Sequence, residues 1–250
     1  MLAIIGGTGL SRLADLDITR REIVRTPFGE PSGPLTFGKV GDAEVCFLAR
    51  HGYGHTLAPH EVNYRANLWA IREVGARRVV AVNSVGGIAP ALGPGVIAIP
   101  DQIIDYTWGR KHTFFEGPEA PVKHADFTHP YCAVTRKLLA DAANRAGIPF
   151  VDHGVYAATQ GPRLETAAEI ARLQRDGASM VGMTGMPEAV LARELDLPYA
   201  AIALSVNHAA GLGDSKDAIQ LDELQAVLDA GMRQVLRVLG AAVALHQDNA

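Results

Sequence analysis

Residues 1–10, MLAIIGGTGL, decide the fold class of this chain. Residues 2–5 are apolar and have the length of a buried β-strand, and a glycine-rich turn around Thr8 ends them. A strand end that offers exposed backbone N–H groups and a hydroxyl is a suitable cradle for an anion. The motif is weak on its own, because a tight turn without any ligand has the same composition.

Strand-length apolar runs alternate with helical stretches along the rest of the chain. The expected strands include residues 2–5, 79–82, 96–99 and 199–204, and the expected helices cover 61–74, 134–146, 166–175, 187–194 and 221–245. This alternation predicts an α/β fold, with a single domain over residues 1–250 and a mixed, largely parallel central sheet flanked by helices. The longest irregular piece, residues 109–130, exceeds a usual connection, so we expect it to serve function or an interface.

Composition and charge exclude several classes of partner. The net charge of −4 leaves no broad basic field, so we expect neither nucleic acid nor a membrane surface as a partner. Cys46 and Cys132 each lie in an apolar stretch, which suits a reduced, cytoplasmic protein better than a disulfide framework. The first residues lack a basic segment, so we expect no secretory signal and no membrane span there.

A more specific cluster follows an apolar run at residues 45–49. Arg50, His51 and His55 bring a planar charge and imidazoles to the end of that expected strand. The His-Glu pair at 60–61 begins a zinc-protease motif, but Tyr64 stands where the second histidine is needed, so we expect no metal. The glycine turn at the N-terminus also lacks the last glycine of a dinucleotide fingerprint, which weakens a Rossmann-type interpretation.

Polar groups recur at the ends of other expected strands. Ser84 and the amide of Val85 follow the second strand, and Thr184 lies in a Gly-Met-Thr-Gly turn. Together with the glycine turn, these loops could converge on one phosphate group. Asn207 follows the last strand, which is the usual ligand end of a parallel sheet. Glu165 precedes an expected helix, where the alternative explanation is a favourable interaction of an acid with the helix dipole.

Five separated motifs resemble the trimeric purine nucleoside phosphorylase family, above all its methylthioadenosine phosphorylase branch. They are IIGGTGL, ARHGYGHT with PHEVNYRAN, the GGI turn followed by PG and DQIIDYT, ATQGPRLET, and GMTGMPEAVLA, in family order. The resemblance implies a nucleoside phosphorylase-like fold and a homotrimer. It also implies cleavage of a purine nucleoside by inorganic phosphate, which is a co-substrate, with no cofactor and no metal.

The resemblance also implies a role for individual residues. Those expected to hold phosphate are Thr8, Arg50, His51, Ser84, Val85 and Thr184. Those expected at the base are Leu164, Glu165 and Asn207. Those expected at the ribose and its 5′ group are Met183, Leu221 and His124, the last of which would reach across from a neighbouring subunit. Among all of these, Asn207, Arg50 and His51 are the expected catalytic residues.

The expected base pocket favours a 6-oxopurine. The Asn207 amide both donates and accepts, so it can bind the 6-oxygen and a protonated N7. Glu165 would accept from N1–H of a 6-oxopurine but would face the N1 lone pair of adenine. The adenine-selective branch of the resembled family has Asp in place of both Asn207 and Ala209, whereas its 6-oxopurine branch has a glutamate at the place of Glu165. Leu164 departs from the Phe common in the 6-oxopurine branch.

In the 6-oxopurine branch, a histidine binds the 5′-hydroxyl of the ribose. Leu221 of this chain aligns with that histidine. An apolar residue there matches the methylthio branch. We therefore expect a pentosyltransferase that converts 5′-methylthioinosine and phosphate to hypoxanthine and 5-methylthioribose 1-phosphate. The alternatives are an inosine or guanosine phosphorylase and then a methylthioadenosine phosphorylase. Two alternatives belong to other classes of protein: a Rossmann-type oxidoreductase and a nucleoside-binding regulator without catalytic activity.

Overall fold

The computed structural model describes residues 1–10, 16–118 and 120–248, except the side chains of Leu221 and Glu223. Its sheet of 11 strands is built around a parallel centre. The central strands are β4 (Ala43–Ala49), β1 (Leu2–Gly6), β5 (Arg78–Gly87) and β11 (Tyr199–His208). An antiparallel hairpin of β2 (Asp17–Glu22) and β3 (Leu35–Val40) extends one side. The other strands are β10 (Met180–Gly182), β9 (Val155–Ala158), β7 (Gln102–Asp105), β6 (Ile97–Ala98) and β8 (Phe150–Val151).

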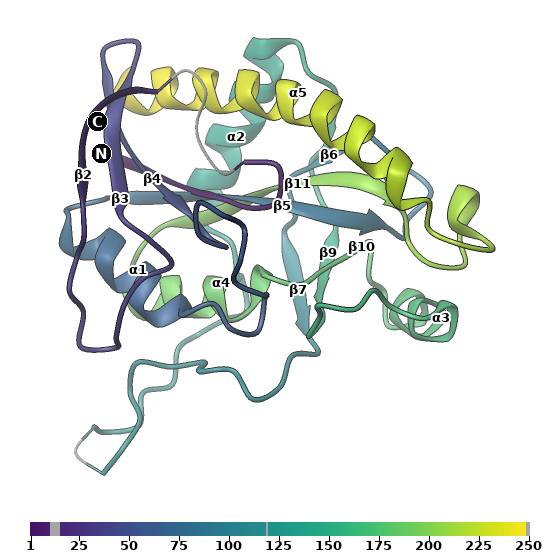
Figure 1. The fold of residues 1–250 in the computed structure, drawn as a ribbon, viewed down its shortest axis with the longest axis horizontal. Coiled ribbons are helices and arrows are strands. Elements are labelled where there is room, and N and C mark those ends of the chain that lie inside the picture. Colours follow the sequence, from purple (N-terminus) through teal and green to yellow (C-terminus); the bar gives the residue numbers. More distant parts are fainter. Residues whose placement is uncertain (11–15, 119, 249–250) are drawn as a thin grey trace.

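Helices cover both faces of this sheet (Figure 1). In β1, Leu2 and Ile4 pack toward α2 (Ala133–Ala146) and α5 (Leu221–Asp248), the yellow helix. Ala3 and Ile5 pack toward α1 (Tyr64–Glu73) and α4 (Gly185–Glu194) on the opposite face. A strand buried on both faces is apolar at every position, because successive side chains point to opposite sides. The predicted α/β fold with a mixed sheet flanked by helices is confirmed.

The helix ends follow from capping residues. The helix predicted over 61–74 begins at Tyr64 because the side chain of Asn63 accepts from the Ala66 N–H at 3.1 Å. The short helix α3 (Ala167–Arg175) begins after Thr166, which forms a reciprocal capping box with Glu169. Residues 109–130 contain no helix or strand in their described part, as predicted. No described helix is both long and apolar enough to cross a membrane.

Two strands run further than the sequence predicts, and both bear on the site. β5 continues to Gly87 and β11 to His208, so Ser84, Val85 and Asn207 lie within strands rather than after them. The extension arises because β5 and β11 pair with each other along almost their full lengths. A register shift between Ser205 and Asn207 marks a bulge in β11, which redirects the side chains that follow it.

One edge of β5 is shared by two strands that do not meet. β1 pairs with β5 as far as Ala81, and the antiparallel β10 pairs only with Gly86 and Gly87. Since β11 occupies the opposite edge, residues 82–85 of β5 have no strand partner on this side among the described residues. The sheet is therefore open at this point, and backbone polar groups of β5 are left for other partners.

The contact between α5 and the sheet gives a test of this packing. A Cβ atom at Gly231 would lie 2.5 Å from the Cδ1 atom of the buried Leu204, so Gly231→Ala should lower the free energy of unfolding by about 1–3 kcal/mol. Gly240 lies on the same helix with open space around its Cα, so Gly240→Ala should be neutral or stabilising by up to about 1 kcal/mol. Urea unfolding of both variants measures the difference. Equal effects would contradict the close approach of α5 to β11.

Candidate functional site

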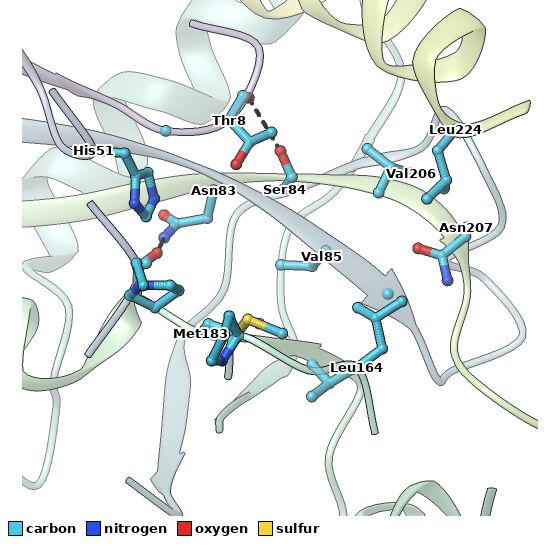
Figure 2. Close-up of a pocket in the computed structure, with 18 of the residues that line it drawn as sticks. Thr8, His51, Asn83, Ser84, Val85, Leu164, Met183, Val206, Asn207 and Leu224 are labelled. Carbon is cyan, nitrogen blue, oxygen red and sulfur yellow. Dashed lines mark hydrogen bonds between the residues drawn. The ribbon is translucent and has the colours of Figure 1, made fainter. Parts of the chain in front are cut away.

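A cavity of about 460 Å³ lies at this opening of the sheet, which is a volume typical of a small-molecule site. Ten of the twelve residues selected from the sequence line it. They are Thr8, Arg50, His51, Ser84, Val85, Leu164, Glu165, Met183, Thr184 and Asn207. Figure 2 shows Thr8, His51, Asn83 and Ser84 toward one end of the cavity, Leu164 and Asn207 toward the other, and Met183 between them.

Arg50 is completely buried and makes a bidentate ion pair with Glu188. Its Nε and Nη2 atoms donate to the two carboxylate oxygens at 2.7 and 2.8 Å, and Nη1 donates to the carbonyl of Val82 at 3.0 Å. Val82 lies in the part of β5 that has no strand partner on this edge. The guanidinium therefore donates to a carbonyl that a neighbouring strand would otherwise satisfy. Tyr199 donates a further hydrogen bond to Glu188 at 2.9 Å. The sequence alone did not indicate Glu188, although the GMTGMPEAVLA motif contains it.

The charge of Arg50 is permanent and balanced. Burial by itself lowers the pKa of the guanidinium, but the charge of Glu188 and its hydrogen bonds raise that pKa above its ordinary value. Among the described residues that line the cavity, Arg50 is the only lysine or arginine. Since Glu188 neutralises it, an anion in the cavity meets a fixed dipole from this pair and not an isolated positive charge.

His51 is neutral near pH 7. Burial, and next the charge of Arg50, lower the pKa of its imidazole from 6.5 to about 4. The Nδ1 atom lies 2.8 Å from the carbonyl oxygen of Leu57, which can only accept, so Nδ1 carries the proton. The other ring nitrogen, Nε2, is then an acceptor. A group that hydrogen-bonds to Nε2 must therefore be the donor.

Hydroxyl groups from three segments surround the same end of the cavity. Asn83 donates from Nδ2 to the hydroxyl oxygen of Thr184 at 2.8 Å, which leaves the Thr184 proton available to another acceptor. The hydroxyl of Ser84 donates to the carbonyl of Thr8 at 3.2 Å, as the dashed line in Figure 2 shows. The Oδ1 atom of Asn83 is buried and has no hydrogen-bond partner in the described chain. Asn83 directly precedes Ser84 in the sequence, but it was not among the residues expected at the site.

Asn207 and Glu165 belong to the opposite end. Because of the bulge in β11, both Val206 and Asn207 line the cavity, and the Asn207 Nδ2 atom donates to the carbonyl of His208 at 2.6 Å. The Oε1 atom of Glu165 accepts from the hydroxyl of Thr159 at 2.6 Å. Leu164 also lines this end and is 44% exposed. The site is thus open to solvent on the side where Leu164 lies.

Arg110 ties two of the loops at the site together, and the sequence did not indicate it. Its Nη1 atom donates to the carbonyls of Met183 at 2.8 Å and Met186 at 2.6 Å. Its Nη2 atom donates to the carbonyls of Thr159 at 3.3 Å and Gln160 at 2.8 Å. Carbonyls at loop ends need such donors when they are withdrawn from water. The loop after β9 and the loop after β10 are therefore held at a fixed spacing.

Two selected residues are not among the described residues that line the cavity. His124 lies on the exposed loop in a separate hollow with Lys123, His129 and Arg193, so its expected reach into another subunit stays a prediction. The side chain of Leu221 lies outside the described residues. Ile219 and Leu224 supply apolar surface to the cavity in the same part of the chain. No group of three or more potential metal ligands is found within the described ranges.

Comparisons with known proteins agree on one family. The sequence profile of the phosphorylase superfamily matches residues 1–244. The chain is 52% identical over 239 residues to a probable S-methyl-5′-thioinosine phosphorylase of Xanthomonas campestris, covering 96% of this chain and 95% of that one. It is 44% identical over 249 residues to a 6-oxopurine nucleoside phosphorylase of Pyrococcus furiosus, covering 98% and 92%. The methylthioadenosine phosphorylase of Schistosoma mansoni, solved with adenine, superposes with a TM-score of 0.94 at 33% identity, over 99% and 92% of the two chains.

Removing one partner of the buried ion pair should destabilise the fold strongly. Glu188→Gln leaves the Arg50 charge buried without a compensating carboxylate, so we expect a loss of about 3–5 kcal/mol in the free energy of unfolding. Asp141→Asn is the control, because it breaks the exposed Lys137–Asp141 pair of 2.6 Å and should change that free energy by less than about 0.5 kcal/mol. Urea unfolding compares the two. A Glu188→Gln variant as stable as the control would show that the carboxylate does not stabilise the buried charge.

His51 should make stability depend on pH in a defined window. Its pKa is 6.5 in an ordinary environment and about 4 in the folded chain, so between these values the unfolded state binds a proton that the folded state excludes. The free energy of unfolding therefore contains a contribution that is complete above the higher value and is lost as pH falls toward the lower one. His51→Gln should remove this part of the dependence, as measured by urea unfolding across that range. Identical pH profiles for the two proteins would refute it.

Proposed function

The chain belongs to the phosphorylase superfamily, and from this premise we propose that it cleaves 5′-methylthioinosine with inorganic phosphate. The products are hypoxanthine and 5-methylthioribose 1-phosphate, which makes the enzyme a pentosyltransferase of purine salvage. The observation that carries the proposal is one cavity with anion-binding groups at one end and the Asn207 and Glu165 side chains at the other. Met183 lies between these two ends, and we propose that the ribose packs against it.

The phosphate end binds an anion through fixed dipoles and hydroxyls. The hydroxyls of Thr8, Ser84 and Thr184 and the backbone of Val85 line this end together with Arg50. The neutral His51 Nε2 atom accepts a hydrogen bond, so it suits a phosphate oxygen that carries a proton. Such preorganised groups need no rearrangement when the reaction begins.

The reaction needs no protein nucleophile. Phosphate itself attacks the anomeric carbon of the ribose while the bond from that carbon to the purine nitrogen breaks, and positive charge builds on the sugar. The bound phosphate is the counter-charge to this cation, so the enzyme acts by holding the two reactants in position. We propose that neither a metal nor a cofactor takes part.

The base end stabilises the leaving purine and selects it. The electron pair of the broken bond moves into the purine ring, and N7 takes up a proton from the solvent that reaches the site beside Leu164. The protonated N7 then donates to the Asn207 carbonyl oxygen, while the amide donates to the 6-oxygen. An ionised Glu165 accepts from N1–H. Adenine has a lone pair at N1 and a donor at position 6, so it would leave buried polar groups unpaired, which can reduce activity by up to about 10⁴-fold.

The 5′ group faces apolar surface. Ile219 and Leu224 line the cavity and suit a methylthio group better than a hydroxyl. Leu221 is proposed to add to this surface. The Xanthomonas relative is named for a methylthioinosine activity, which supports the same choice. A second candidate is an inosine or guanosine phosphorylase, favoured by the 44% identity to the Pyrococcus 6-oxopurine nucleoside phosphorylase.

We also propose a homotrimer in which His124 of one subunit completes the site of its neighbour. The support is its position on a long exposed loop away from the cavity of its own chain. A reduced, cytoplasmic location is proposed from the two free cysteines, Cys46 and Cys132.

Steady-state kinetics with phosphate test the proposed function. We expect the highest kcat/KM for 5′-methylthioinosine, a lower value for inosine and the lowest for 5′-methylthioadenosine, because the last mismatches both Asn207 and Glu165. The Asn207→Asp, Ala209→Asp double variant should shift the preference toward the 6-amino base by about tenfold or more. Asp141→Asn, on the surface of α2, serves as the control variant. A wild-type preference for 5′-methylthioadenosine would overturn the assignment of the base, and a preference for inosine would favour the second candidate.

A further inference from the structure

Thr159 lies directly behind the base end, at the end of β9, and is not among the residues that line the main cavity. Its hydroxyl donates to Oε1 of Glu165 at 2.6 Å, while the carbonyl of Gly182 lies further away at 3.3 Å. A hydrogen bond to an ionised carboxylate is among the stronger ones in proteins. The Thr159 proton is therefore committed to Glu165.

Thr159 is itself held from two sides. Its N–H donates to the carbonyl of Gly182 at 2.8 Å, and its own carbonyl accepts from Arg110 Nη2 at 3.3 Å. The β-branched side chain also has few accessible χ1 rotamers, so the hydroxyl position is defined by the backbone. Glu165, by contrast, lies in the irregular segment before α3 and is only half-buried. The hydrogen bond from Thr159, called the tether below, therefore fixes the orientation of the Glu165 carboxylate.

A fixed carboxylate discriminates between bases and a mobile one does not. With Oε1 engaged by Thr159, the Oε2 atom is the acceptor that a base can use, and an ionised oxygen cannot donate. A 6-oxopurine presents N1–H to it, whereas adenine presents a lone pair. A carboxylate free to rotate would turn away from adenine and reduce the mismatch, so the selectivity depends on the tether as well as on the acid.

We propose that Thr159 is a positioning residue that sets the preference for 6-oxopurines by holding the Glu165 carboxylate through its hydroxyl. This inference rests on the proposed function, since it assigns Glu165 to the base. Thr159 touches neither substrate nor the reacting atoms. It acts only through Glu165.

Thr159→Val removes the hydroxyl and keeps the size of the side chain, and Thr159→Ser keeps the hydroxyl. We expect the Val variant to lose about tenfold to hundredfold in kcat/KM for 5′-methylthioinosine, mainly through a higher KM for the nucleoside. The loss for 5′-methylthioadenosine should be smaller than about threefold, and the KM for phosphate should change by less than about twofold, because the phosphate end is built from other segments. The Ser variant should recover most of the activity.

A double-variant cycle with Glu165→Gln separates positioning from general damage. The Thr159→Val effect should largely disappear in the Glu165→Gln background, because the carboxylate that it orients is gone. Equal losses for the two nucleosides, or the same loss in both backgrounds, would overturn the proposal. If Thr159→Val does not fold, as judged by thermal unfolding, Thr159→Ala replaces it.

Binding of the free bases keeps the test independent of turnover. Calorimetry should show that wild-type protein prefers hypoxanthine to adenine and that Thr159→Val narrows this preference by about tenfold or more. If the wild type binds hypoxanthine selectively but releases no base with phosphate, the proposed function fails while the positioning role stands. An unchanged base preference in Thr159→Val, or none in the wild type, overturns the positioning role.

Discussion

The opening along one edge of β5 is the constraint on which the rest of the site depends. β1 leaves this edge after Ala81, and β10 joins it only at Gly86, so four residues of a central strand face a gap in place of a neighbouring strand. Buried backbone groups cannot remain without partners. The gap must therefore be filled by polar groups, and a cavity lined by strand backbone and hydroxyl groups, of the kind that bind anions, is a direct consequence of this topology.

The Arg50–Glu188 pair follows from the same gap. The guanidinium satisfies the Val82 carbonyl, but a buried charge needs a counter-charge, and Glu188 on α4 provides it. Burial of such a pair adds little net stability compared with an apolar core, because both ions lose their hydration. The importance of the pair lies in where it holds the guanidinium. The hydrogen bonds fix Arg50 against β5, and the field that an anion meets there is already in place before it binds.

The sequence predicts the parts of this arrangement that have a local cause. Apolar periodicity locates the central strands and the five α-helices of the described chain, and the glycine and hydroxyl motifs locate ten residues of one cavity. It does not predict partners that are distant along the chain. Arg50 and Glu188 are 138 positions apart, and Arg110 donates to carbonyls that every residue type possesses. The lengths of β5 and β11 were underestimated because their ends are polar, and only their mutual pairing extends them through Ser84 and Asn207.

The two ends of the cavity are built from different parts of the fold, and this difference affects how substrate specificity can change. The proposed phosphate end is made mainly from the ends of central strands. Arg50, His51 and Thr184 are almost fully buried there, whereas Thr8 is exposed. The proposed base end combines Asn207, on β11, with the loop residues Leu164 and Glu165. Thr159 holds the Glu165 carboxylate, and Arg110 in turn holds the carbonyl of Thr159. Substitutions at separate sites without shared partners act almost independently. In the proposed reaction, the choice of purine can therefore change through a few side chains at the proposed base end, while the part of β5 proposed to face phosphate stays the same.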